Sequence, residues 1–249
     1  MALLVRRLPL LPVLVLALAA AVQAQIPSTF TNLQVLPQDI NRGELIGVMR
    51  NFAGSLGVRC LHCHVGTDGD RFSDVDFAAD DHETKRVARV MLGMVAQINE
   101  TLTSKTGRAL ADLTEVTCLT CHHGNSVPVT LRAALGDAYS VGGAQELLRR
   151  YGELREEYYG RAVYDFAPHA LVSQAEGLVE QHEDPDGAVA VLKENLKHYP
   201  DSHYTFYVLG QVYIESGEKK RGVRALRKAV KMDPDNSWYR TALAEAQKD

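Results

Sequence analysis

Two short motifs carry the residues best suited to do chemistry. They are Cys60-Leu61-His62-Cys63-His64 and Cys118-Leu119-Thr120-Cys121-His122, and they contain all four cysteines of the 249-residue chain. Each places two thiols one helical turn apart and an imidazole beside the second thiol. Such thiols can add across the two vinyl groups of a haem while the imidazole binds its iron, and Cys-x-x-Cys-His is the attachment signal of c-type haem. The motifs therefore predict two c-type haems, bound covalently by Cys60, Cys63, Cys118 and Cys121 with His64 and His122 as iron ligands.

Other uses of paired cysteines fit the sequence less well. A zinc site made of two Cys-x-x-Cys pairs usually has about 15–20 residues between the pairs. Cys63 and Cys118 are much farther apart than that, and zinc would leave both histidines unexplained. A thioredoxin-like site needs one pair near a βαβ pattern, which the sequence lacks, and neighbouring cysteines within Cys-x-x-Cys are poorly placed to form structural disulfides.

Each haem iron also needs a sixth ligand or an open position. Methionine raises the reduction potential and suits electron transfer. Three methionines lie on expected helices that precede a motif, although a single methionine can equally be core filler: Met49, Met91 and Met94. The competing histidines lie within a motif, beside one, or at the start of the second expected helix: His62, His123 and His82.

Helical patterns surround both motifs. Asn41 with Glu44 forms an N-cap pattern, apolar residues then recur at helical spacing as far as Leu56, and Gly57 ends the run. An acidic loop over 66–81 leads into a second helix over about 81–102. The inner face of that second helix is expected to carry Val87, Met91, Met94, Ile98 and Leu102.

The second half of the chain has a different pattern. A helix over 141–163 is expected to link two domains. Pro200 and Pro234 then lie 34 residues apart, and the residues between them follow the tetratricopeptide spacing. The fold class predicted is mainly α, with a dihaem c-type cytochrome domain over 25–140 followed by tetratricopeptide-like repeats and a capping helix over 164–249.

The N-terminus predicts export. Residues 1–24 combine Arg6 and Arg7, an apolar run and small residues at a cleavage site, as in a secretory signal peptide. We therefore expect a periplasmic protein, without a lipid anchor since no cysteine follows the cleavage site. The formal net charge of −4 argues against nucleic acid as a partner. Two charged segments, acidic over 68–83 and basic over 219–231, are either solvated surfaces or docking sites for redox or other protein partners.

Residues 32–128 resemble the photosynthetic reaction centre cytochrome c subunit family. The likeness includes the stretches Asn32-Leu33-Gln34-Val35-Leu36-Pro37, Val48-Met49-Arg50-Asn51-Phe52 and Ala88-Arg89-Val90-Met91-Leu92-Gly93-Met94, together with both haem motifs. The resemblance implies that Met49 is the axial ligand of the first haem and Met91 that of the second, with Met94 as the alternative. The family's subunit carries four haems and lacks the repeat region, whereas this chain has two motifs.

The motifs and the resemblance together predict an electron carrier, not an enzyme. Such a protein transfers electrons between redox partner proteins, in a photosynthetic or a respiratory chain, and its repeat region binds a protein partner. Two alternatives stay open. One is a dihaem enzyme such as a peroxidase, which needs one exchangeable iron position and an acid–base residue above it, with His82 as the candidate. The other is a haem redox sensor on a repeat scaffold.

Overall fold

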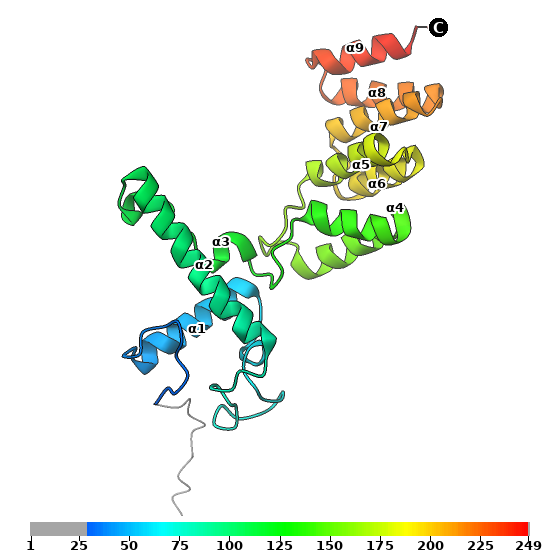
Figure 1. The fold of residues 1–249 in the computed structure, drawn as a ribbon. Helices are drawn as coiled ribbons and strands as arrows, with labels where there is room; N and C mark the ends of the chain where they lie inside the picture. The colour runs from blue at the N-terminus through cyan, green and yellow to red at the C-terminus, as the bar shows by residue number, and fades with distance from the viewer. Residues whose placement is uncertain (1–28, 249) are drawn as a thin grey trace, which may run out of the picture. The chain divides into compact units, whose positions relative to one another are not determined.

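The computed structural model describes residues 29–248, so the expected signal peptide over 1–24 lies outside the described part. The described chain is helical and contains no strand, which confirms the mainly α fold class (Figure 1). The α-helices are α1 (Arg42–Leu56), α2 (Glu83–Thr106), α3 (Cys118–His122), α4 (Leu131–Tyr158), α5 (Pro168–His182), α6 (Pro185–His198), α7 (His203–Glu215), α8 (Lys219–Met232) and α9 (Ser237–Ala246). Short 3-10 turns are η1 (Cys60–His62) and η2 (Leu110–Asp112).

The chain divides into two compact units. Among the described residues, the first holds 29–42 and Cys60–Leu92, and the second holds Gly43–Arg59 and 93–248. The first haem motif thus belongs to the first unit, whereas α1 and the second motif belong to the second. The expected domain limits at 140 and 163 remain predictions.

The end of α1 is fixed by a close approach of two backbones. Gly57 ends the helix with φ +68°, and a Cβ at this position would lie 2.0 Å from the carbonyl oxygen of Gly124. The backbone N–H of Gly124 also donates to the carbonyl of Ser55 at 2.9 Å. Because any side chain at Gly57 would clash with this backbone, glycine there both ends α1 and lets it contact the turn after the second motif.

The hydrophobic core lies in the helical region that follows residue 130. Its largest cluster combines fully buried side chains of α4, α5 and α6, such as Leu135, Tyr151, Leu171 and Leu192. α4 begins where Thr130 accepts a hydrogen bond from the N–H of Ala133, and it is interrupted at Gly142 and Gly143. Its second half corresponds to the helix expected to link two domains.

Successive helices pack on one another from α5 to α9. Gly210 of α7 and Gly222 of α8 meet at the contact between these helices, where a Cβ on Gly222 would lie 2.8 Å from the carbonyl oxygen of Gly210. Apolar residues of the repeat pattern are buried here, including Phe206, Leu209 and Ala229. The packing of α7 on α8 agrees with the predicted tetratricopeptide repeats, and that assignment stays a prediction. Within residues 29–248, no helix has the length and apolar character needed to cross a membrane.

Candidate haem sites

The first motif forms a single tight turn. The backbone N–H groups of Cys63 and His64 both donate to the carbonyl of Cys60, at 3.2 and 3.1 Å. Both thiols are free; Cys60 is exposed and Cys63 is half-buried, and burial raises the pKa of the Cys63 thiol. The turn therefore presents two thiols and an imidazole from five consecutive residues, which is the donor set that covalent haem attachment needs.

His64 lies in a partly enclosed position next to the turn. Its ring packs edge-on against Phe77, with 5.0 Å between the ring centroids. Burial, followed by the positive charge of Lys85, lowers the pKa of His64, so the neutral imidazole is favoured. Its Nδ1 is buried and has no hydrogen-bond partner among the described residues. A neutral imidazole is the form that binds a metal ion, so this environment suits an iron ligand.

The second motif forms α3, a single helical turn. Thr117 begins it with a capping box, in which the N–H of Thr117 donates to the hydroxyl of Thr120 at 2.9 Å. The helix ends at His123, which has the left-handed backbone conformation with φ 50°. Cys118 and Cys121 have free thiols on this turn. The second motif thus offers the same donor set as the first.

His122 is oriented by two linked hydrogen bonds. Its Nδ1 lies 2.9 Å from the backbone carbonyl oxygen of Asn125. A carbonyl can only accept, so Nδ1 carries the proton and the lone pair of Nε2 is left for a metal ion. The side-chain amide of Asn125 in turn donates to the hydroxyl of Tyr164 at 2.7 Å. The histidine of the second motif is therefore held by a residue that lies beyond α4.

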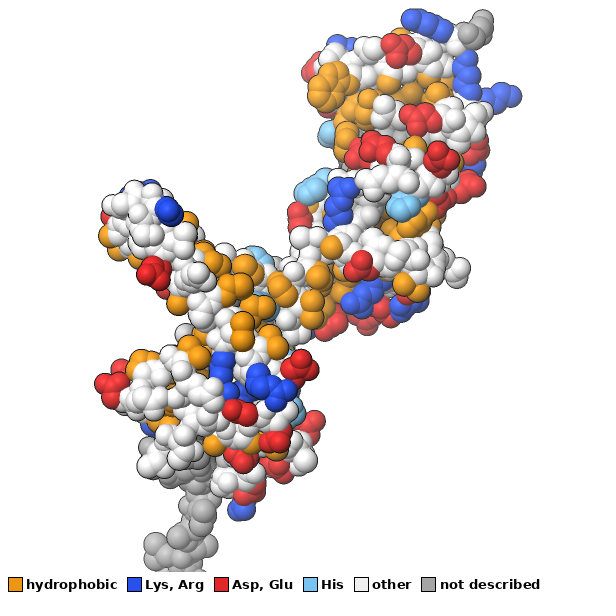
Figure 2. All heavy atoms as spheres, viewed as in Figure 1, with side chains coloured by type: hydrophobic (Ala, Val, Ile, Leu, Met, Phe, Trp, Pro, Cys, Tyr) orange, Lys and Arg blue, Asp and Glu red, His pale blue; other side chains and the backbone are white. Residues whose placement is uncertain are grey.

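Apolar surface next to the motifs is left uncovered by protein. α2 has no buried residue, and Figure 2 shows hydrophobic side chains gathered on its open surface. Among the described residues up to 130, the only hydrophobic residues with buried side chains are Leu45 and Val75. Large exposed side chains on α2 are Val87, Val90, Met91, Met94 and Ile98. An open cleft of about 460 Å³ also lies beside Cys121, lined in part by Val129, Leu131 and Val163.

The residues at both motifs are suited to bind haem. A patch of this kind marks a binding surface, because soluble proteins rarely leave large apolar side chains together in water. Haem would cover apolar surface, and the free thiols and the two imidazoles would supply the attachment and iron-binding groups. His64 and His122 would bind iron, and the four cysteines would form the thioether links.

The methionines expected as sixth ligands lie on helices, as predicted. Met49 is half-buried on α1, while Met91 and Met94 are 38% and 47% exposed on α2. Met91 and Met94 are three residues apart, so both lie on one side of the helix. Met49 and the first motif belong to different units. The assignment of Met49 and Met91 as axial ligands, with Met94 as the alternative, stays a prediction.

The acidic segment between the motifs uses much of its charge internally. Asp70 accepts from the N–H of Thr67 at 2.6 Å, Asp74 pairs with Arg71 at 3.0 Å, and the carboxylate of Asp76 accepts from two backbone N–H groups. These contacts shape the loop and favour its interpretation as a solvated, folded loop. Within residues 29–248, no three His, Cys, Asp or Glu side chains gather to hold a metal ion.

Several residues that support the motifs had not been predicted. Thr84 donates from its hydroxyl to the carbonyl of His62, and Lys85 donates to three carbonyls of the loop that contacts His64. Asn125 and Tyr164 support His122. The one available sequence signal was proximity, because Asn125 lies three residues after His122. Tyr164 is 39 residues from Asn125 and carried no such signal.

Comparison with known families agrees with this chemistry. Residues 67–144 match the model of the photosynthetic reaction centre cytochrome C subunit family. The matched stretch contains α2 and the second motif, and it begins after the first motif. No curated protein sequence matches the chain. The family match points to a c-type cytochrome with a role in electron transfer, and c-type haem is the cofactor that this family implies.

Proposed function

We propose that this chain is an exported, periplasmic c-type cytochrome that carries two haems and transfers electrons between redox partner proteins. The observation that carries the proposal is the repeated donor set of two free thiols and a histidine, on turns that lie in a part of the chain with almost no protein core of its own. Haem iron supplies one-electron chemistry by cycling between the ferric and ferrous states.

The residues of the chain have distinct tasks in this function. Cys60 and Cys63 hold one haem, and Cys118 and Cys121 hold the other. His64 and His122 would each supply one iron ligand, the first through a partly buried ring and the second through an imidazole fixed by Asn125. Methionines from α1 and α2 would supply the other iron ligand, exclude water and favour the ferrous state. The helices from α5 to α9 would dock a protein partner.

Mass and light absorption of the exported holoprotein test the proposal. After expression with a haem attachment system, the mass should equal the chain from Gln25 plus two haems. Replacing Cys118 and Cys121 together by alanine should remove one haem and leave the other. A protein without covalent haem, or one that holds zinc through these cysteines, would refute the proposed function.

Carbon monoxide separates a carrier from a dihaem enzyme. A carrier with both iron positions filled by protein ligands should bind carbon monoxide slowly or not at all in the ferrous state. An enzyme such as a peroxidase needs one exchangeable position. Rapid binding by one of the two haems of the unmodified protein would therefore favour the enzyme alternative.

A further inference from the structure

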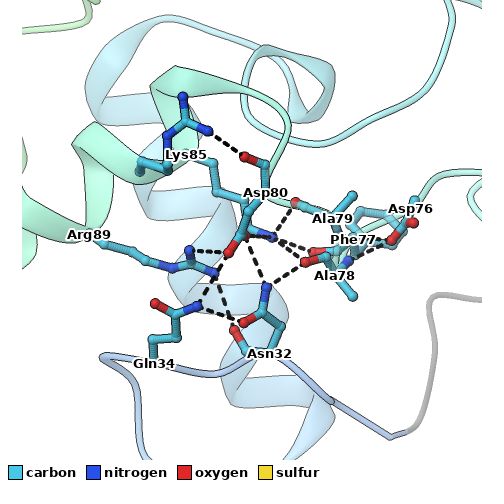
Figure 3. A network of polar contacts seen from close by, with 10 residues as sticks. Asn32, Gln34, Asp76, Phe77, Ala78, Ala79, Asp80, Lys85 and Arg89 are labelled. Atoms are coloured by element: carbon cyan, nitrogen blue, oxygen red, sulfur yellow. Dashed lines mark hydrogen bonds and ion pairs between the residues drawn. The ribbon is translucent and has the colours of Figure 1, made fainter.

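Lys85 is a nearly enclosed cation close to the first haem motif. Its side chain is 11% exposed, and its Nζ forms an ion pair with Asp80 at 3.0 Å. The same Nζ donates to the carbonyl oxygens of Phe77, Ala78 and Ala79 at 3.0, 3.0 and 2.7 Å (Figure 3). Four acceptors around one ammonium group fix its position in the first turn of α2.

The backbone that Lys85 holds lies against His64. Asp76 donates its N–H to the carbonyl of Val65, the residue after His64, at 2.8 Å. Phe77 then places its ring edge-on against the His64 ring. The neighbouring Thr84 binds the carbonyl of His62 within the motif itself. The start of α2 and the loop before it thus form hydrogen bonds with the residues on both sides of His64.

A second cation completes this group. Arg89 is 16% exposed and pairs with Asp80 at 2.8 Å, and it also donates to the carbonyl of Asn32 at 3.3 Å. The side-chain amide of Asn32 donates to Asp80 at 2.9 Å and to the carbonyl of Ala78 at 2.5 Å (Figure 3). Hydrogen bonds from Arg89, Lys85 and Asn32 hold the pKa of Asp80 well below its usual range, so one carboxylate faces two cations.

The charge of Lys85 lies close to the iron ligand. Its Nζ is 3.0 Å from the carbonyl oxygen of Phe77, and the ring of Phe77 packs against His64 with 5.0 Å between the ring centroids. A positive charge held beside this ring opposes the extra positive charge of ferric over ferrous haem. Partly buried charges act more strongly than exposed ones because water screens them less.

We propose that Lys85 is a positioning residue for the first haem, which holds segment 76–80 against His64 and raises the reduction potential of that haem through its enclosed positive charge. Asp80 is the counter-charge that limits this effect, and Arg89 holds Asp80 in place. The proposal rests on the proposed function, since it needs haem at Cys60 and Cys63.

Redox titration of the dihaem holoprotein tests the proposal. Lys85→Met keeps the length of the side chain and removes its charge, so the equilibrium constant for reduction of one haem should fall about tenfold, or 59 mV for a one-electron couple. Lys85→Arg should stay within about twofold of the unmodified protein. Lys105→Met is the matched control, because Lys105 is an exposed cation in the last turn of the same helix.

The haem that responds is identified by removing the first one. In a protein with Cys60→Ala and Cys63→Ala, Lys85→Met should leave the potential of the remaining haem unchanged. A haem-free protein would refute the proposed function, and it would be recognised by its mass before any titration. If both haems are present but neither potential moves, or if Lys105→Met has the same effect, the role of Lys85 is refuted while the proposed function stands.

Asp80→Asn provides a test that works even where Lys85→Met fails to fold. Removing the carboxylate leaves the two cations uncompensated, so the potential of the first haem should rise. If the substitutions only loosened the loop, the first haem would become more exposed to water in Lys85→Met and in Asp80→Asn alike. Its potential would then shift in the same direction in the two variants. Opposite shifts therefore support the proposal, and shifts of the same sign overturn it.

Discussion

His122 is bound through its Nδ1 to the carbonyl oxygen of Asn125, at 2.9 Å. This bond lies within the turn that follows the second motif, yet Asn125 is itself held by Tyr164, which lies beyond α4. Such hydrogen bonds behind a metal-binding histidine fix its ring orientation and tune its basicity. The helical region thereby contributes to the environment of the second motif.

Tyr164→Phe should disturb this arrangement without removing any haem ligand. The amide of Asn125 loses its acceptor, and a lost hydrogen bond of this kind reduces the free energy of unfolding by about 1 kcal/mol. We expect two haems by mass and a changed potential for the second haem only. Tyr204→Phe is the matched control, because its hydroxyl donates to Glu176 within the helical region. Equal potentials in both variants would show that Tyr164 does not act on His122.

Leu192→Ala tests whether the helical region unfolds separately from the haem motifs. Leu192 is fully buried on α6 within the largest core cluster. Truncation of a buried leucine to alanine destabilises a protein by about 2–5 kcal/mol. Helical circular dichroism should show an earlier unfolding transition, while the Soret absorption of the haems keeps its midpoint. Lys193→Ala, at an exposed position, is the control. A shift of both signals together would indicate one cooperative unit and contradict the expected domain limit.

Helix ends could be predicted from the sequence because they depend on residues that are close together in the chain. The periodic apolar residues and Gly57 correctly predicted where α1 ends, whereas the residues predicted as the inner face of α2 are largely exposed in the structure. The interruption of α4 at Gly142 and Gly143 coincides with the start of the linking helix expected over 141–163, whereas the first half of α4, from Leu131, had not been predicted. The contacts of Lys85 and Tyr164 depend on loops that return to the motifs from elsewhere, and residue spacing does not encode such tertiary contacts.

The stability contributed by Asp80 should depend on pH. Its pKa is lowered in the folded protein, so its interactions are fully present above the pKa of an unfolded aspartate, about 3.9, and are lost as the pH falls through the folded value. The difference in unfolding free energy between the unmodified protein and Asp80→Asn should therefore be largest above pH about 4 and shrink progressively below it. Urea unfolding at several pH values measures this difference. Asp68→Asn in the same loop is the control, and a difference for Asp80 that does not vary with pH would contradict the prediction.

Replacing the methionines one at a time should identify the sixth ligands. Met49→His should keep the first haem six-coordinate and lower its potential, because imidazole favours the ferrous state less than a thioether does. Met91→His should do the same for the second haem. Met94→Leu should leave both potentials unchanged, although Met94 lies about one turn from Met91 and is similarly exposed. Each variant needs a redox titration and a spectrum in the near-infrared region, where the methionine–iron bond of the ferric haem absorbs.

Met94 provides the sharpest comparison of the three. If Met94→Leu abolishes the methionine–iron absorption of one haem while Met91→Leu preserves it, Met94 is the ligand and Met91 is core filler. If neither substitution alters the absorption, the ligand comes from elsewhere. The half-buried His82, just before α2, would then be tested by His82→Ala. Because replacement by leucine keeps the apolar volume of methionine, loss of the absorption with normal helical circular dichroism assigns the ligand without confusing it with a folding defect.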